Sequence, residues 1–327
     1  MRRLMTTGAV AVAGAAVLTG CVAEVPAPVT SAPPMTEAAA LLEPQSTQII
    51  DETLAELAAA DRAGDADLLS ARVGGDAKTL REIEYTLAEA EDGAEPVAIP
   101  STMQAVYVSG ADIWPRTLVS VTEQASEDVT PVVLLWVQDS IDAEYQLRGW
   151  AHMIPGATLP AMPGTSSGAA QLEMTTDTLD PTPEAVLTDY AELLRQGEGS
   201  DLAASFGADS YRERLFAARE TLTEAAEDSD GEYRDAVSAD LVGSYVMGTA
   251  DGGALVFTPL TITSSFTVED ATVSIPDEDE PLLEGELDDT VTHEYLDMIV
   301  MYLPGPDVDA LPAVVAAEHT LINVSDS

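Results

Sequence analysis

The sequence predicts an α+β protein made of two tandem units, each with helices packed on a curved antiparallel sheet. Helix-like segments precede strand-like segments in residues 46–162 and again in residues 183–327. Residues 163–182, rich in Gly, Ser, Thr and Pro, have the composition of a linker between the units. A cleaved signal peptide and a flexible tether are expected before the first unit.

The first 20 residues have the layout of an export signal. Arg2 and Arg3 give a basic start, and Gly8 to Leu18 form an apolar run that is too short to span a bilayer. The next residues, Leu18-Thr19-Gly20-Cys21, resemble the lipobox of bacterial lipoproteins.

That resemblance implies cleavage after Gly20, a diacylglycerol on Cys21 and often an N-acyl chain such as palmitate. Two or more chains give lasting attachment, so the membrane is an expected partner through this N-terminal lipid. The implied location is the outer face of the cytoplasmic membrane, and the alternative is ordinary secretion. Residues 21–45 contain five prolines among small residues and are expected to form the anchor and tether.

Two regions of the chain align at offsets of 133 to 136 residues. Asp67-Leu68 aligns with Asp201-Leu202, and Thr86 to Ala90 aligns with Thr221 to Ala225. Chance similarity between Ala-rich and acidic segments is the alternative. The order of the predicted elements favours duplication.

The second unit has the clearer helix signals. Thr182 is a predicted N-cap, followed by Pro at the first turn, an apolar face at i, i+3, i+4 and i+7, and a stop at Gly197. A second helix is predicted after Asp209-Ser210. In the first unit, apolar spacing predicts one helix that ends at Gly64 and another around Leu80 to Leu87.

Segments rich in β-branched and aromatic residues follow the helices in both units. In the first unit, the predicted strands are 103–108, 116–123, 132–138 and 146–154. In the second unit, they are 241–247, 254–266, 291–303 and 314–324.

This order of elements, with the turn Gly64-Asp65-Ala66-Asp67-Leu68, is similar to the nuclear-transport-factor-2-like fold. The resemblance implies conical units whose curved sheets enclose a pocket against the helices. In composition and layout the chain also resembles actinobacterial lipoproteins of unknown function, which implies no activity.

Charge and cysteine content exclude several classes of function. The chain of 327 residues has 58 acidic and 13 basic side chains, a net charge of −45, and one cysteine. Such a surface repels phosphate backbones, so nucleic acid is excluded as a partner. One cysteine allows neither a disulfide framework nor a thiolate metal cluster.

Two of the three histidines, His152 and His319, lie in the last predicted strand of each unit. Enzymes with the nuclear-transport-factor-2-like fold place such residues on the pocket wall as acid or base, and histidine suits proton transfer near neutral pH. A half-exposed sheet histidine without a catalytic role is the alternative. Trp136, Trp150 and Tyr295 are candidates to line a ligand pocket, or else they fill the core.

Residues 269–289 contain ten acidic side chains and no basic one. They lack the spacing of an EF-hand loop, so an acidic loop is expected and no metal site is assigned. Motifs of common hydrolases, nucleotide-binding proteins and zinc proteases are missing, and no cofactor is expected.

These observations favour a non-catalytic envelope lipoprotein that binds a small ligand or another envelope protein. The alternative is a pocket enzyme, either a lyase, an isomerase or a hydrolase, that uses His152 or His319 as base. A structural spacer whose pockets are filled by its own side chains is a third possibility.

Overall fold

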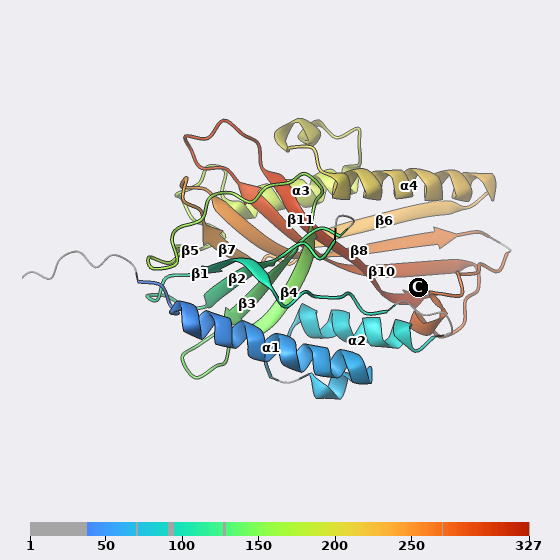
Figure 1. Ribbon diagram of the computed structural model, residues 1–327. Coiled ribbons are helices and arrows are strands. Elements are labelled where there is room, and N and C mark those ends of the chain that lie inside the picture. The colour runs from blue at the N-terminus through green and yellow to red at the C-terminus, as the bar shows by residue number, and fades with distance from the viewer. Residues whose placement is uncertain (1–37, 70, 91–94, 127–128, 270, 327) are drawn as a thin grey trace, which may run out of the picture. The chain divides into compact units, whose positions relative to one another are not determined.

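A computed structural model describes residues 38–326, except residues 70, 91–94, 127–128 and 270 (Figure 1). The predicted signal peptide, Cys21 and most of the predicted tether therefore lie outside the described residues. The described residues belong to one compact unit. Among the helices of the described segments, none combines the length and apolar character needed to cross a membrane.

The described part is a mixed α/β structure with a large antiparallel sheet, as predicted at the level of fold class. The helices are α1 (Glu43–Ala63), α2 (Asp76–Ala88), α3 (Pro183–Gln196) and α4 (Ser210–Asp228), with short 3₁₀ turns η1 (Ala66–Leu68), η2 (Asp201–Ser205) and η3 (Glu280–Leu282). The strands before α3 are β1 (Met103–Val108), β2 (Arg116–Thr122), β3 (Val132–Gln138), β4 (Gln146–Met153) and β5 (Gln171–Leu172). The strands after α4 are β6 (Glu232–Ala239), β7 (Tyr245–Gly248), β8 (Ala254–Thr267), β9 (Leu283–Glu284), β10 (Thr290–Leu303) and β11 (Ala313–Ser325).

Both helices of the second half begin where the sequence predicts, and α3 also ends at the predicted residue. The side chain of Thr182 caps α3 by accepting a hydrogen bond from the backbone N–H of Ala185, and α3 ends at Gly197. Asp209 caps α4 in the same way, because its Oδ1 accepts from the N–H of Arg212 at 2.7 Å. In the first half, Gly64 ends α1 with φ +60°, a backbone conformation that glycine adopts at low cost.

The strands form one sheet of order β1-β2-β3-β4-β11-β10-β8-β7-β5. β6 pairs with the C-terminal half of β8, residues 260–267, and β9 pairs in parallel with β11. The last strands of the two halves, β4 and β11, meet at the middle of this order through Met153 and His152 opposite Ala316 and Ala317. Strands β1 to β4 of the first half thus lie in chain order, and the second-half strands β11, β10, β8 and β7 continue the sheet in reverse chain order.

Part of the predicted linker takes part in this sheet. Residues 163–182 contribute β5, which pairs with β7, and Ala169 forms a bridge to Ser109. Backbone hydrogen bonds therefore incorporate part of the predicted linker into the sheet. In Figure 1 the helix pair α1 and α2 and the helix pair α3 and α4 lie on opposite sides of the strands.

Strand β3 shows how the core is divided, because both of its faces are buried. Leu134 and Trp136 pack in a cluster with apolar residues of α1 and α2. Val133 and Leu135, on the other face, pack in a cluster that also contains Met298 of β10. A strand that is covered on both faces has a nearly continuous apolar sequence, so apolar and polar residues do not alternate along β3.

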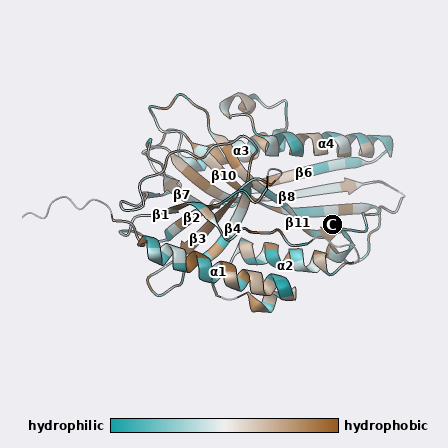
Figure 2. Ribbon diagram, viewed as in Figure 1, coloured by the Kyte–Doolittle hydropathy of each residue, from teal (hydrophilic) through white to brown (hydrophobic). Residues whose placement is uncertain are grey.

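The sequence does not predict strand β6, because this segment has no apolar run. Its residues alternate between exposed and half-buried along the whole strand, and it lies at an edge of the sheet beside β8. In Figure 2, β6 and the neighbouring part of β8 are pale to teal, whereas β2 and β3 are brown. The structure also begins β7 at Tyr245, later than the predicted strand start at residue 241.

Candidate functional site

His319 belongs to a hydrogen-bonded triad in the second half. It lies on β11 directly opposite Asp297 of β10, and its Nδ1 is 2.8 Å from both carboxylate oxygens of that residue. Asp297 is completely buried and also accepts a hydrogen bond at 2.5 Å from the hydroxyl of Tyr211. The carboxylate therefore orients the imidazole, whose Nε2 lies on the side of the ring away from Asp297.

The first turn of α4 places Tyr211 in this triad. Asp209, the N-cap of α4, is buried and accepts hydrogen bonds at 3.2 Å from the hydroxyl of Tyr190 on α3. Burial raises the pKa of Asp209, while the backbone N–H and the charge of Arg212 lower it. Burial, followed by the neighbouring Asp297, raises the pKa of Tyr211 well above its usual value, so its hydroxyl stays a hydrogen-bond donor.

His319 also borders a cavity of about 60 Å³ under α4. The cavity is lined by apolar side chains of α3, α4 and the sheet, including Leu194, Leu215, Val237 and Ile262. Arg219 and Asp235 lie on its wall and form an ion pair, with Nε 2.7 Å from Oδ2. The histidine ring is thus partly enclosed by apolar groups, and 35% of its side-chain surface is exposed.

A larger hollow of about 670 Å³, which we name the α4 cleft, shares part of its wall with this cavity. The shared residues are Leu222, Tyr233, Ser264 and Tyr295. The remaining walls come from α4, β8, β10 and the segment after β8, and include Ala225, Ser229, Phe266, Val268, Ala271, Thr272, Val273, Ser274, Ile275, Pro276, Asp279, Val291 and His293. Part of the predicted acidic loop is therefore one wall of a cleft.

Three rings form a row from the α4 cleft to the inner cavity. Tyr295 stacks on His319 with ring centroids 4.4 Å apart and on His293 at 6.3 Å. Burial lowers the pKa of His293 below its usual value, and Asp279 opposes this shift from 3.8 Å. Burial raises the pKa of Tyr295 to about 12. The cleft therefore presents a neutral imidazole and a neutral phenol at neutral pH.

His152, the other candidate base, lies where the two halves meet. Its Nδ1 is 2.7 Å from Oε2 of Glu318 on β11, and this hydrogen bond is the main cause that raises the pKa of His152. The charge of Glu84, a half-buried residue on α2, adds to the shift. Among the hollows described here, none is lined by His152. The structure thus does not bring the two predicted histidines into one site.

The predicted pocket aromatics divide between core and cleft. Trp136 and Trp150 are 0% and 1% exposed and belong to the core cluster under α1 and α2. They fill space in the first half and border none of the hollows described here. Tyr295 lies on the wall of the α4 cleft, and its role in ligand binding stays a prediction.

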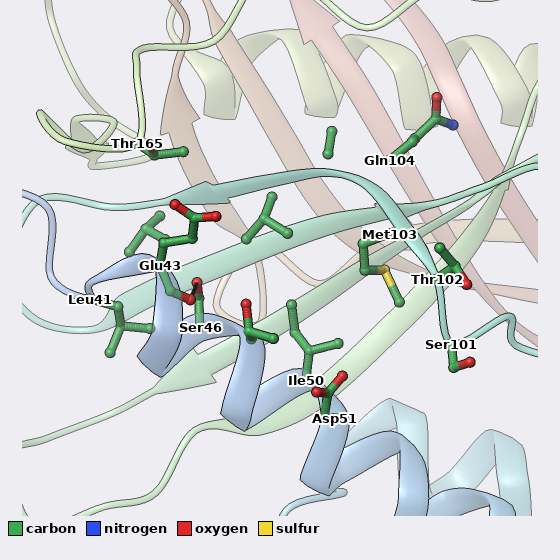
Figure 3. Close-up of a pocket in the computed structure, with 14 residues that line it drawn as sticks. Leu41, Glu43, Ser46, Ile50, Asp51, Ser101, Thr102, Met103, Gln104 and Thr165 are labelled. Atoms are coloured by element: carbon green, nitrogen blue, oxygen red, sulfur yellow. Dashed lines mark hydrogen bonds between the residues drawn. The ribbon is translucent and has the colours of Figure 1, made fainter.

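A third hollow, of about 550 Å³, lies in the first half between α1 and the segment that leads into β1. Figure 3 shows Glu43, Ser46 and Ile50 along α1 on one side and Thr102 and Met103 on the other. No aromatic residue and no histidine is among its described lining residues, in contrast to the α4 cleft.

The sequence does not predict that Asp297 and Tyr211 belong to this site. Asp297 is an acidic residue inside the long apolar run of β10. A charge in a buried strand requires partners, so this position is the one sequence signal that points to the site. Nothing in the local sequence links Tyr211 to it across 86 positions. In the described segments, no group of three His, Cys, Asp or Glu side chains is placed to hold a metal ion.

Comparison with known proteins gives a family but no characterised relative. A family model described as a domain of unknown function, DUF8094, matches residues 39–324. A search of curated proteins gave no match. A search of solved structures also gave no match. The match covers both helix pairs and nearly every strand of the sheet, so the chain belongs to the DUF8094 family.

Proposed function

We propose that the protein is a lipid-anchored binding protein on the outer face of the cytoplasmic membrane, and that its α4 cleft receives a small organic molecule. The cleft is the observation that carries this proposal. Its volume of about 670 Å³ lies in the range of small-molecule sites, and its lining is mostly apolar with a few polar groups such as Ser264 and His293.

The anchor rests on the lipobox-like stretch that ends at Cys21 and on the proline-rich residues that follow it. Labelled fatty acid supplied to cells should appear in the wild-type protein and not in Cys21→Ala. Equal labelling of the two proteins would contradict the anchor.

We also propose that the two halves are copies of one unit resembling the nuclear-transport-factor-2-like fold. Each half has helix, 3₁₀ turn, helix and then strands, and the copies would be related by a twofold axis beside the β4 and β11 pair. Superposition of residues 43–153 on 183–325 in an experimental structure tests this: the duplication requires α1, α2 and β4 to fall on α3, α4 and β11.

Filling the α4 cleft tests the binding function. Ala225 is an exposed residue of α4 on the cleft wall, so Ala225→Trp places a large ring where the molecule would lie. Protein purified from its own membrane should release a bound small molecule on solvent extraction, measured by mass spectrometry, and Ala225→Trp should release at least about tenfold less, because a filled site loses its apolar contacts.

Ala217→Trp is the matched control. Ala217 is an exposed residue two turns earlier on α4 and is not part of the cleft, so this variant should retain the bound molecule. Identical recovery from both tryptophan variants would overturn the cleft as the binding site.

A second candidate is a pocket enzyme, a lyase, isomerase or hydrolase, in which His319 acts as base. The hydrogen bond between its Nδ1 and buried Asp297 favours this candidate, since a carboxylate fixes the tautomer and leaves Nε2 as the nitrogen that would face a reacting group. The triad lies beside the inner cavity, where a reacting group that enters from the cleft would meet it.

The variant His319→Gln separates the two candidates. A glutamine can accept or donate hydrogen bonds but cannot transfer a proton at neutral pH. If the protein is an enzyme, wild type and variant should release different molecules, product from one and substrate from the other, resolved by chromatography and mass spectrometry. The same molecule from both proteins would leave the binding function and exclude His319 as base.

A further inference from the structure

The described lining of the α4 cleft contains one acidic side chain and no basic side chain other than a histidine. None of its described lining residues is Lys or Arg, and the one carboxylate among them is Asp279. Asp279 is about one-fifth exposed, and its nearest basic neighbour, His293, is 3.8 Å away, beyond hydrogen-bond distance. The cleft therefore contains a partly buried negative charge without a close cationic partner among the described residues that line it.

The neighbouring charges do not offset Asp279. Arg219, at the inner cavity, is held by Asp235, and the only other histidine nearby, His319, is held by Asp297. The whole chain carries a net charge of −45. An anionic ligand would enter this cleft against the local and the overall field, whereas a cation would be attracted by both.

Aromatic rings face the same space. Tyr233, Phe266 and Tyr295 line the cleft. The π face of an aromatic ring attracts cations, and Tyr233 and Phe266 are the candidate rings for this contact, because Tyr295 already stacks on His293 and His319. Leu222, Val291 and the apolar residues of segment 273–276 supply a surface for an uncharged body.

We propose that the ligand of the α4 cleft is an organic cation, an amine or quaternary ammonium with an apolar body, whose charge lies between Asp279 and the ring of Tyr233. This inference rests on the proposed binding function and specifies its ligand class. The apolar body extends along Phe266 and Val291, which lie at the end of the cleft away from the inner cavity.

Three probes of equal chain length test the charge preference: octyltrimethylammonium, 1-octanol and octanoate. The full chain carrying Cys21→Ala, which lacks the lipid acceptor, is titrated with each probe by calorimetry. The cation should bind at least about tenfold more tightly than the alcohol, and octanoate should bind most weakly, because hydrogen-bonded or paired charges in partly buried sites are worth about that much.

Asp279→Asn should reduce octyltrimethylammonium affinity about tenfold and leave octanol affinity unchanged. Glu278→Gln is the matched control, because Glu278 is the exposed neighbour on the same segment and the change in net charge is identical. It should change the affinity less than about threefold, as an exposed charge does. Added salt should weaken surface attraction in all variants and keep the difference between them.

A pH series gives an independent readout. Below its lowered pKa, His293 becomes cationic beside Asp279, and Asp279, whose pKa burial raises, also approaches protonation. Tyr233 and Tyr295 stay neutral, because burial raises both of their pKa values. Affinity for octyltrimethylammonium should therefore fall as the pH falls, and His293→Gln should move this fall to lower pH.

The outcomes separate the two proposals. Equal affinities for the three probes, all abolished by Ala225→Trp, would overturn the cation preference and leave the binding function standing. Probe binding that Ala225→Trp and Asp279→Asn both leave unchanged would place it outside the cleft and overturn both proposals.

Discussion

Arg81 and Glu84, two charged residues of α2, are enclosed by the fold of the first half. Arg81 is fully buried, 2.8 Å from the carboxylate of Glu84 and 4.9 Å from the centroid of the Trp150 ring, and it donates a hydrogen bond to the carbonyl of Val97. Even with this partner, burial raises the pKa of Glu84 to about 7. Desolvation thus outweighs the attraction of Arg81, and the folded state takes up a proton at Glu84.

The stability of Glu84→Gln relative to wild type should therefore increase as the pH rises. A carboxyl whose pKa is higher in the folded state than its usual 4.5 stabilises the fold less and less between about pH 4.5 and 7. Glu84→Gln keeps the neutral form at every pH. Its free energy of unfolding, relative to wild type, should rise by about 1–3 kcal/mol between pH 5 and 8 in urea denaturation.

Glu89→Gln provides the control for this experiment, because Glu89 is exposed at the C-terminal end of the same helix. Its stability difference from wild type should stay nearly constant over the same pH range. A Glu84→Gln difference that is equally flat would show that Arg81 holds the carboxylate charged throughout.

At the scale of elements, the sequence predicts best where a local signal is strong. The Thr182 cap and Gly197 define α3, and apolar runs define β3, β8 and β10 closely. The edge strand β6 has no such run, and β5 depends on pairing with β7 far along the chain. Pairing partners lie in tertiary structure, so neither strand can be recognised from its own residues.

In the candidate site, too, the sequence predicts single residues better than the contacts between them. Tyr295 lies on the wall of the α4 cleft and His319 lies in β11, whereas their roles in binding or proton transfer stay predictions. Their grouping depends on the register of β10 against β11, which sets Asp297 opposite His319, and on the first turn of α4, which brings Tyr211 to the same carboxylate. Residue types and spacing do not encode those contacts.

At the scale of the whole molecule, one core cluster contains residues of both halves. Val119, Val133 and Leu135 of the first half pack in one cluster with Phe257 and Met298 of the second. The two other large clusters each belong mainly to one half, one under α1 and α2 and one under α3 and α4. The shared cluster buries apolar surface that either half alone would expose, so the halves should depend on each other for stability.

Two matched substitutions test this dependence. Leu134, in the cluster under α1 and α2, and Leu260, in the cluster under α3 and α4, are both almost completely buried. Leu134→Ala and Leu260→Ala should each cost about 2–5 kcal/mol, because each leaves a cavity in a packed core. Calorimetry should show one unfolding transition in both variants, shifted to lower temperature, because loss of one half exposes the shared cluster of the other. Two separate transitions, with only one of them shifted by each variant, would mean that the halves unfold independently in spite of their common sheet.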